Sequence, residues 1–396
     1  MSQGEASAPV ERYLESGDEA GSAPDDRPYR PDVEGLRAVA VSLVILLHFE
    51  VPGFTGGFVG VDVFFVISGF VICGLLLRER VATEKNSLLD FYARRFRRIL
   101  PASTLVLVVA VATTYVFVST RAGVSTAKDG RWVAAFLANF YFAKPGSNSL
   151  SALANYWSLS VEEQFYLVFP TLFVLVSKSK RGPPFRVRLS VGLGAVIVGS
   201  YMLSVISTSD NARWAYVSPF TRAWELALGA LIASTTPWLK RIPPSIAAVT
   251  TWLGGGAVLL SALVFSGISD YPGWRVAVPV LGTAMVIAGG VVVPRLGIEV
   301  VLSLTAFRWI GQRSYSLYLW HWPVLIVAAE MGFTGMFWKV RLPCLVLTIV
   351  LAMLTYRFVE NPIRHWRLPS RQSVWFGLLL AITTIVGLSA AIALSR

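Results

Sequence analysis

Residues 57–77 read GFVGVDVFFVISGFVICGLLL, and a single ionisable side chain, that of Asp62, interrupts this apolar run. An α-helix rises 1.5 Å per residue, so a run of this length can cross the roughly 30 Å of hydrocarbon in a lipid bilayer. Over the whole chain of 396 residues, 55% are hydrophobic and only 15% are charged. Such a composition excludes an ordinary soluble domain and predicts a polytopic membrane protein.

Ten further apolar windows of comparable length predict additional spans. They lie near 36–50, 100–119, 161–177, 188–207, 220–235, 247–267, 275–293, 314–331, 340–357 and 373–394. The segment 132–142 is too short to span and is interpreted as an interfacial or re-entrant piece. The predicted fold class is therefore an all-α membrane helix bundle with eleven spans.

Basic residues predict how this bundle is oriented. With eleven spans and the N-terminus inside, 25 of the 35 Lys and Arg residues fall in inner segments, as the positive-inside rule requires. The sequence thus predicts a multi-pass protein of the inner (plasma) membrane with a cytoplasmic N-terminus and an extracytoplasmic C-terminus. The same inner loops explain the formal net charge of +12, so a nucleic-acid partner is not implied. Residues 1–34 are acidic and rich in small residues, which predicts a disordered cytoplasmic tail.

Several polar side chains fall inside predicted spans, where an ionisable group costs about 2.5–3.5 kcal/mol on insertion scales. This cost makes them candidates for function, although solvation at a helix end is the alternative explanation. The predicted topology places six ionisable residues in the outer third of the membrane: His48, Asp62, Glu162, Glu163, Arg222 and Glu225. The candidates to line a cavity are Ser68, Arg222, Glu225, Tyr318 and His321. For His321, a hydrogen-bonded core histidine is the equal alternative.

Arg37 and His48 stand eleven residues apart on the first predicted helix. At 1.5 Å per residue this separation is about 16 Å, or half of the membrane, and eleven residues make about three turns. Both side chains therefore project from roughly the same face, with Arg37 at the inner mouth and His48 deep toward the outside. A topology anchor is the alternative role for an arginine at this boundary.

Residues 88–101, LLDFYARRFRRILP, predict an amphipathic interfacial helix in the inner loop after the second span. Its basic side consists of Arg94, Arg95, Arg97 and Arg98. This helix either attaches to anionic lipid headgroups or binds the phosphates of a soluble donor. The second role is chemically suitable because one guanidinium group can bind two phosphate oxygens at once. A Gly-rich P-loop motif is absent from the chain, which excludes a nucleoside triphosphatase of that class.

The cysteines and histidines carry no metal or disulfide signal. Cys73 and Cys344 lie in separate apolar runs, and the three histidines are equally scattered. Neither a disulfide framework nor the spacing of metal ligands can be read from these positions. The sequence therefore predicts no metal site.

Six ordered motifs carry a resemblance to a known family. They are EGLRAVAVSLVILLHF (34–49), GGFVGVDVFFVISGFVI (56–72), FYARRFRRILP (91–101), YWSLSVEEQFYLVFP (156–170), SYSLYLWHWP (314–323) and YRFVENPIR (356–364). Together they closely resemble the membrane acyltransferase-3 family of O-antigen O-acetylase-like enzymes. The resemblance implies ten core transmembrane helices that move an acyl group, acetyl, succinyl or similar, from cytoplasmic acyl-CoA to a hydroxyl of an extracytoplasmic or lipid-linked glycan. The acceptor is thus a carbohydrate or glycolipid of the cell envelope.

The resemblance also implies domain boundaries and site residues. It identifies 35–371 as the acyltransferase domain and 372–396 as one additional C-terminal transmembrane helix, like the connector that leads to an extracytoplasmic SGNH domain in some members. Arg37 and His48 match the characteristic Arg and His of the family's first helix. The family's arginine pair in the first inner loop matches either Arg94 with Arg97 or Arg95 with Arg98. No GDS-type nucleophile motif of an SGNH domain occurs in the chain.

The mechanism expected from these residues is acyl transfer in the membrane domain. Acyl-CoA is a donor substrate and not a permanently bound cofactor. Its phosphates are expected on the inner arginines, and its pantetheine is expected to extend past Arg37 into the bundle. His48, whose ordinary pKa of about 6.5 suits proton transfer near neutral pH, would deprotonate the glycan hydroxyl. Glu163 or Glu162 would orient its ring, and Asp62 is a further catalytic candidate. An acyl-imidazole on His48 is the open variant, and a transporter of an anionic or acylated substrate is the competing function.

Overall fold

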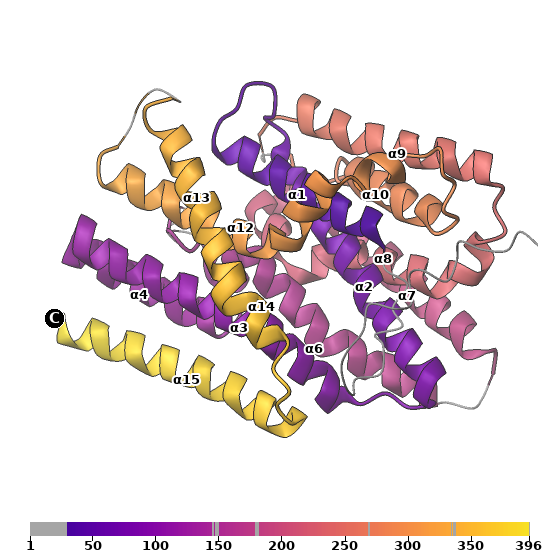
Figure 1. Ribbon diagram of the computed structural model, residues 1–396, viewed down its shortest axis with the longest axis horizontal. Coiled ribbons are helices and arrows are strands. Elements are labelled where there is room, and N and C mark those ends of the chain that lie inside the picture. Colours follow the sequence, from indigo (N-terminus) through magenta and orange to yellow (C-terminus); the bar gives the residue numbers. More distant parts are fainter. Residues whose placement is uncertain are drawn as a thin grey trace, which may run out of the picture. The chain divides into compact units, whose positions relative to one another are not determined.

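The computed structural model describes residues 30–395 apart from 145, 147–149, 179–181, 268–269, 334 and 336–337. Within these residues every regular element is a helix (Figure 1), which confirms the all-α fold class. The first half contains α1 (Pro31–His48), α2 (Gly60–Thr83), α3 (Leu88–Thr113), α4 (Thr120–Ala134), α5 (Ala138–Phe142), α6 (Tyr156–Lys178) and α7 (Phe185–Val217). The second half contains α8 (Pro219–Leu239), α9 (Pro244–Val264), α10 (Ala277–Gly290), α11 (Glu299–Leu302), α12 (Thr305–Glu330), α13 (Arg341–Thr355), α14 (Asn361–Arg364) and α15 (Ser370–Leu394). Short 3₁₀ or π-helical turns adjoin α2, α3 and α13: η2 (Gly57–Val59), η3 (Thr114–Val118) and η4 (Tyr356–Glu360).

Seven of the described helical segments are long and apolar enough to cross a membrane, which fits a multi-pass membrane protein. They cover Gly57–Thr83, Leu88–Val118, Tyr156–Lys178, Phe185–Val217, Pro244–Val264, Arg341–Arg364 and Ser370–Leu394. Helices α1, α8 and α12 are 18, 21 and 26 residues long, but their ionisable and polar side chains make them less apolar than these seven. The count of ten core helices therefore stays a prediction.

The start of α1 corrects one predicted boundary. The tail predicted at 1–34 falls mostly on residues 1–29, which lie outside the described residues. The last residues of that range form the first turn of α1, which begins at Pro31. Proline suits the first position of a helix because its missing N–H would have no partner there. The acidic Asp32 and Glu34 in the same turn are stabilised by the positive end of the helix dipole.

The amphipathic segment 88–101 is not a separate interfacial helix. It is continuous with the following span in α3, and Pro101 lies inside this helix, as membrane helices permit. Ser87 caps the N-terminus, where its hydroxyl accepts a hydrogen bond from the N–H of Asp90 at 3.2 Å. The arginines therefore belong to the same helix as the span, and the packing of that helix decides where each one points.

Helix α4 runs back along α3 instead of crossing the bundle independently. A Cβ on Gly123 would lie against the ring of Tyr115, and a Cβ on Gly130 would lie 3.6 Å from Leu107. The two contacts progress in opposite directions along the chain, so α4 is antiparallel to α3. The predicted non-spanning piece 132–142 comprises the end of α4, a turn and α5, which fits the re-entrant interpretation.

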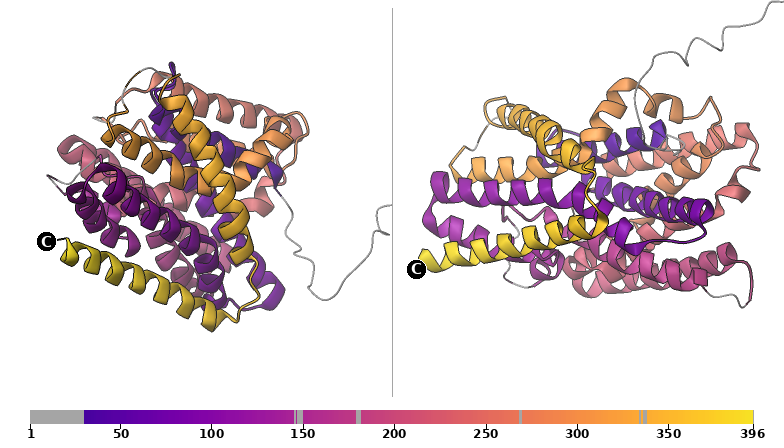
Figure 2. Two further views of the ribbon diagram at one scale, coloured as in Figure 1. Left: turned by 60° about the vertical axis from the view of Figure 1, so that its left-hand side comes forward. Right: turned by 60° about the horizontal axis from the view of Figure 1, so that its bottom comes forward.

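Helix α15 lies beside α3 and α4, as Figures 1 and 2 both show. It covers the position predicted for the additional C-terminal helix, and its 25 residues are apolar enough to span a membrane. Arg97 joins it to α3, because the guanidinium donates to the carbonyl of Leu368 and to the hydroxyl of Ser373. A polar contact at one end and apolar packing along the helices thus place α15 against the bundle.

Close packing explains three of the four glycines in residues 57–77. A Cβ on Gly69 would lie 1.8 Å from the carbonyl oxygen of Leu226 on α8, and a Cβ on Gly60 would lie 2.2 Å from that of Ala40 on α1. Gly57 meets α1 in the same way. These distances leave no room for a side chain, so the backbone of α2 is held directly against α1 and α8. At Gly74, by contrast, the nearest atom would be an arginine nitrogen at 3.5 Å.

Candidate active site

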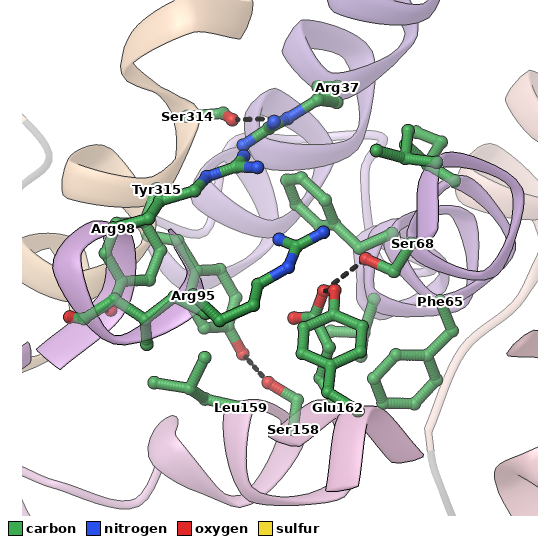
Figure 3. Close-up of a pocket in the computed structure, with 17 residues that line it drawn as sticks. Arg37, Phe65, Ser68, Arg95, Arg98, Ser158, Leu159, Glu162, Ser314 and Tyr315 are labelled. Carbon is green, nitrogen blue, oxygen red and sulfur yellow. Dashed lines mark hydrogen bonds between the residues drawn. The ribbon is translucent and has the colours of Figure 1, made fainter. Parts of the chain in front are cut away.

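A cavity of about 80 Å³ lies among α1, α2, α3, α6 and α12 (Figure 3). Its charged lining consists of Arg37, Arg95, Arg98 and Glu162. Hydroxyl groups complete its polar lining: Ser68, Ser158, Tyr166, Ser314, Tyr315 and Tyr318. The volume suffices for several water molecules, so a small chemical group fits inside, whereas a whole nucleotide does not.

The guanidinium groups give this cavity a positive charge. Arg37 donates from Nε to the hydroxyl of Ser314 at 3.2 Å, and the guanidinium of Arg95 lies 4.7 Å from the ring centre of Tyr166. Arg95 is only 8% exposed, and within the described part of the chain neither Arg95 nor Arg98 forms a salt bridge. Among the residues that line the cavity, three cations thus face one carboxylate, with the buried Glu163 and Glu360 near the same arginines behind the lining. The excess of positive charge at the lining favours an anionic ligand.

The carboxylate of Glu162 is held by two hydroxyl groups. Ser68 on α2 and Tyr166, one turn further along α6, both donate to the same oxygen atom of Glu162. The neighbouring Glu163 does not line the cavity, and one of its oxygen atoms is buried with no hydrogen-bond partner in the described residues. Of the two acids that the sequence proposed, Glu162 is therefore the one that meets the cavity.

The structure separates the two arginine pairs that the sequence left open. Arg94 forms a salt bridge with Glu79 at 3.0 Å, and Arg97 binds the segment at the start of α15. Neither lines the cavity, whereas Arg95 and Arg98 do. Residues three apart share a helical face, so each pair points in its own direction. The geometry therefore favours Arg95 with Arg98 as the donor-binding pair.

His48 lies against a second histidine on α12. Its Nδ1 is 3.1 Å from Nε2 of His321, and the Nδ1 of His321 is 2.6 Å from the carbonyl oxygen of Tyr318. The indole of Trp322 packs on His48 with a ring separation of 4.7 Å. His321 is fully buried and supports His48, so it does not line the cavity as the sequence predicted. Helices α1 and α12 are parallel. Arg37 of α1 contacts Ser314 of α12, and further along both helices His48 contacts His321.

Tyr318 connects the histidines to the cavity. Its ring lines the cavity, and its hydroxyl lies 2.5 Å from that of Ser158. Its carbonyl accepts from His321, whose ring centre is 5.2 Å from the ring centre of Tyr318. The cavity therefore begins among the arginines and ends within one helical turn of the histidine pair.

The expected pairing of His48 with Glu162 or Glu163 is not found. The hydroxyl of Tyr156, at the start of α6, donates to the carbonyl of Ser103 in the middle of α3. Because α6 then runs antiparallel to α3, the two acids lie opposite the arginines. Glu162 consequently shares the cavity with Arg95. The topology argument had placed both acids near the outer membrane surface, because it took the apolar window to begin there.

Asp62, Arg222 and Glu225 form a separate buried network. Arg222 forms a salt bridge with Asp62 and another with Glu225 at 3.0 Å, and all three side chains are fully buried. The hydroxyl of Tyr271 donates to the second oxygen of Asp62. None of these residues lines the cavity, so the expected catalytic role of Asp62 and the cavity positions of Arg222 and Glu225 lack geometric support. The network joins α2 to α8. Separating these helices would break a buried ion pair and leave an uncompensated charge, so the network holds them together.

Some residues of the site carried no separate sequence prediction. Ser158, Tyr166, Ser314 and Tyr315 line the cavity, although all lie within motifs quoted above. The position of Tyr166 four residues after Glu162 was a usable signal, because side chains at this spacing meet on a helix. The contact of Ser314 with Arg37 joins residues 277 positions apart, and no local pattern predicts it.

Comparison with known proteins identifies the family of this chain. Residues 30–357 match the family described as acyltransferase domain. The chain belongs to this acyltransferase family. It is 32% identical over 356 residues to the peptidoglycan O-acetyltransferase OatA of Listeria monocytogenes, which covers 85% of this chain and 56% of that protein. It is 30% identical over 377 residues to the O-acetyltransferase OatA of Staphylococcus aureus, which covers 90% of this chain and 62% of that protein.

The acyltransferase domain thus includes every helix that lines the cavity, while α15 lies beyond residue 357. The chain spans about three fifths of the length of these curated relatives. No solved structure gives a significant match to it.

Proposed function

We propose that the chain is a membrane O-acyltransferase that moves an acetyl group from cytoplasmic acetyl-CoA to a hydroxyl of a cell-wall glycan. One observation carries the proposal: the arginine-lined cavity ends at Tyr318, whose carbonyl holds the His48–His321 pair. Tyr318 and His321 therefore lie between the anion-binding cavity and the proposed general base. The names of the relatives, which are O-acetyltransferases and in one case a peptidoglycan O-acetyltransferase, favour acetyl as the group and peptidoglycan as the acceptor.

The donor is bound by its charge and by its length. The nucleotide of acyl-CoA stays at the mouth of the cavity, because it is too large for about 80 Å³, and its phosphate oxygens reach inward to Arg98 and Arg95. The pantetheine arm then extends past Arg37 toward Tyr318. Arg37 and His48 are eleven residues apart on α1, or about 16 Å, so a long flexible arm is what this arrangement requires.

The transfer step uses the free nitrogen of His48 as a general base. The imidazole takes the proton of the acceptor hydroxyl while the hydroxyl oxygen attacks the thioester carbonyl. A tetrahedral intermediate forms, and its collapse breaks the carbon–sulfur bond. The leaving CoA thiolate takes up the proton from the imidazolium, which restores His48 and yields CoA and the glycan ester. In a two-step variant the acyl group would first be carried by His48 itself.

Acyl transfer can be measured directly with isotope-labelled acetyl-CoA. Membrane vesicles containing the protein, supplied with labelled acetyl-CoA and a peptidoglycan acceptor, are expected to produce label in an alkali-labile ester on the glycan. Vesicles without the protein serve as the control. Accumulation of label inside the vesicles without ester formation would favour the competing transporter function. As a second control, labelled CoA without an acyl group should give no labelled ester. This result would show that the acyl carbon is the part of the donor that is transferred.

The proposed orientation predicts which loops face outward. Leu150 adjoins Ser151, whose carbonyl accepts from Trp322 beside His48, whereas Lys178 lies at the end of α6 near Arg80. Leu150→Cys should react with an impermeant thiol reagent in intact cells, and Lys178→Cys should react only after permeabilisation. The parent protein is the background control, since both of its cysteines are buried. The reverse labelling pattern would overturn the proposed cytoplasmic donor side.

A further inference from the structure

We infer that His321 is a positioning residue that fixes the tautomer of His48, so that Nε2 of His48 is the nitrogen that accepts the proton. The inference rests on the proposed function, because it concerns the same transfer step. It assigns to His321 a role in the reaction that the cavity lining does not show, since this side chain does not line the cavity but lies between the carbonyl of Tyr318 and the ring of His48.

The argument starts from the carbonyl of Tyr318, which can only accept hydrogen bonds. The Nδ1 of His321 lies 2.6 Å from this oxygen, so Nδ1 carries a proton and donates it. The amide of Asn155 donates to the same oxygen at 2.9 Å. Two side-chain donors thus converge on one carbonyl, and together they hold the ring of His321 in a single orientation.

The second step follows from the single proton of a neutral imidazole. With Nδ1 protonated, the Nε2 of His321 carries a lone pair and is an acceptor. A doubly protonated His321 would need a buried counter-ion, and in the described part of the chain no acid hydrogen-bonds this fully buried ring. The nitrogen 3.1 Å away, Nδ1 of His48, must then be the donor of the contact.

The third step concerns the nitrogen left free. Because Nδ1 of His48 carries its proton, the lone pair of the neutral ring lies on Nε2. The ring cannot rotate freely, since Nδ1 is held by His321 and one face packs on Trp322. When Nε2 takes the proton of the acceptor hydroxyl, His48 becomes an imidazolium that still donates through Nδ1. His321 stays neutral throughout, and no proton passes along the pair.

This arrangement resembles a catalytic triad in its logic, because a third group selects the tautomer of the base. It differs in the nature of that group, which is a neutral imidazole in place of a carboxylate. A neutral acceptor orients the base without adding a negative charge to a membrane-embedded site. The reaction therefore requires, at the position of Nε2 of His321, an atom that accepts a hydrogen bond from His48.

Three substitutions of His321 separate this acceptor requirement from packing. In His321→Gln, the terminal amide oxygen reaches the position of Nε2 and can still accept from His48. In His321→Asn, the shorter amide reaches only the position of Nδ1, and His321→Leu has no acceptor. We expect His321→Asn and His321→Leu to lose about 100-fold or more in kcat, as expected for a misoriented base. His321→Gln should stay within about tenfold of the parent protein.

The donor KM is the internal control, because the arginines that bind the donor are unchanged in all three variants. The measurement is the initial rate of ester formation by purified protein that retains its parental thermal unfolding midpoint. Equal activity of His321→Gln and His321→Asn, at any level, would overturn the acceptor role, and so would full activity of His321→Leu. If His321→Leu fails to fold, the comparison of Gln with Asn decides alone. Full activity of His48→Ala would remove the base on which this inference rests, whereas the absence of ester formation by the parent protein would overturn the proposed function itself.

Discussion

Replacement of His48 by alanine is expected to lower the rate of acyl transfer by about 100-fold to 10,000-fold, the range lost when a general base is removed. The protein should still fold and reach the membrane, because His48 is half-buried at the end of α1. The measurement is ester formation from labelled acetyl-CoA by purified protein. The donor KM should change little, because no phosphate contact is removed.

The chain offers a matched control in its third histidine. His365 is exposed in the turn after α14, and its Nδ1 lies 2.8 Å from the carbonyl oxygen of Asn361, the first residue of that helix. His365→Ala should therefore transfer at the parental rate. A near-normal rate for purified His48→Ala, measured beside this control, would show that His48 is a packing residue and that the base must be sought elsewhere.

Changing Arg95 and Arg98 together to lysine should raise the acyl-CoA concentration needed for half-maximal rate at least tenfold. Lysine keeps the charge, but it lacks the planar fork that binds phosphate at two points. A hydrogen bond to a charged group contributes about 1.5–3 kcal/mol, and about 1.4 kcal/mol corresponds to a tenfold change in affinity. The dependence on acceptor concentration should barely change, because the acceptor is expected at the His48 end of the cavity.

The paired change of Arg94 and Arg97 to lysine is the control within the same helix. These two side chains bind Glu79 and the start of α15, so their replacement should leave donor dependence unchanged. If this pair raises the half-saturating acyl-CoA concentration more than the other pair does, the donor site lies instead on the side of α3 that faces Glu79 and α15. If neither double variant alters donor dependence, the arginines near the start of α3 only attach this end of the helix to lipid headgroups. Donor recognition must then be sought nearer Arg37.

The spans were predictable because the length of an apolar run is a local property. The windows near 57–77, 188–207 and 373–394 correspond to α2, α7 and α15. The prediction was less accurate where polar residues intervene. The sequence predicted an interfacial helix at 88–101 apart from the span near 100–119, but α3 is continuous from Leu88 to Thr113. Small residues in a membrane helix are typical of close packing, which Gly60 and Gly69 of α2 show and Gly74, which meets no backbone, does not.

The site was predictable in its residue types and only partly in its contacts. Arg37 lines the cavity and His48 lies near its far end, as their spacing on one helix suggested. Asp62 looked equally reactive in the sequence, because an acid in a span is costly. Its partner Arg222 is 160 positions away, and this distant partner neutralises that cost without creating a catalytic group.

The sequence by itself determined that this protein is an all-helical membrane protein of the acyltransferase family with cationic and histidine-bearing positions along one helix, since apolar run length, helical spacing and motif order are all local features of the chain. Only the tertiary structure decided that Arg95 and Arg98 face the cavity and that His321, in place of an acid, contacts His48. Adjacent residues on a helix differ by about 100° of rotation, so the neighbouring helices decide which of them meets a cavity. Those neighbours come from distant parts of the chain, and their contacts form only when the helices pack.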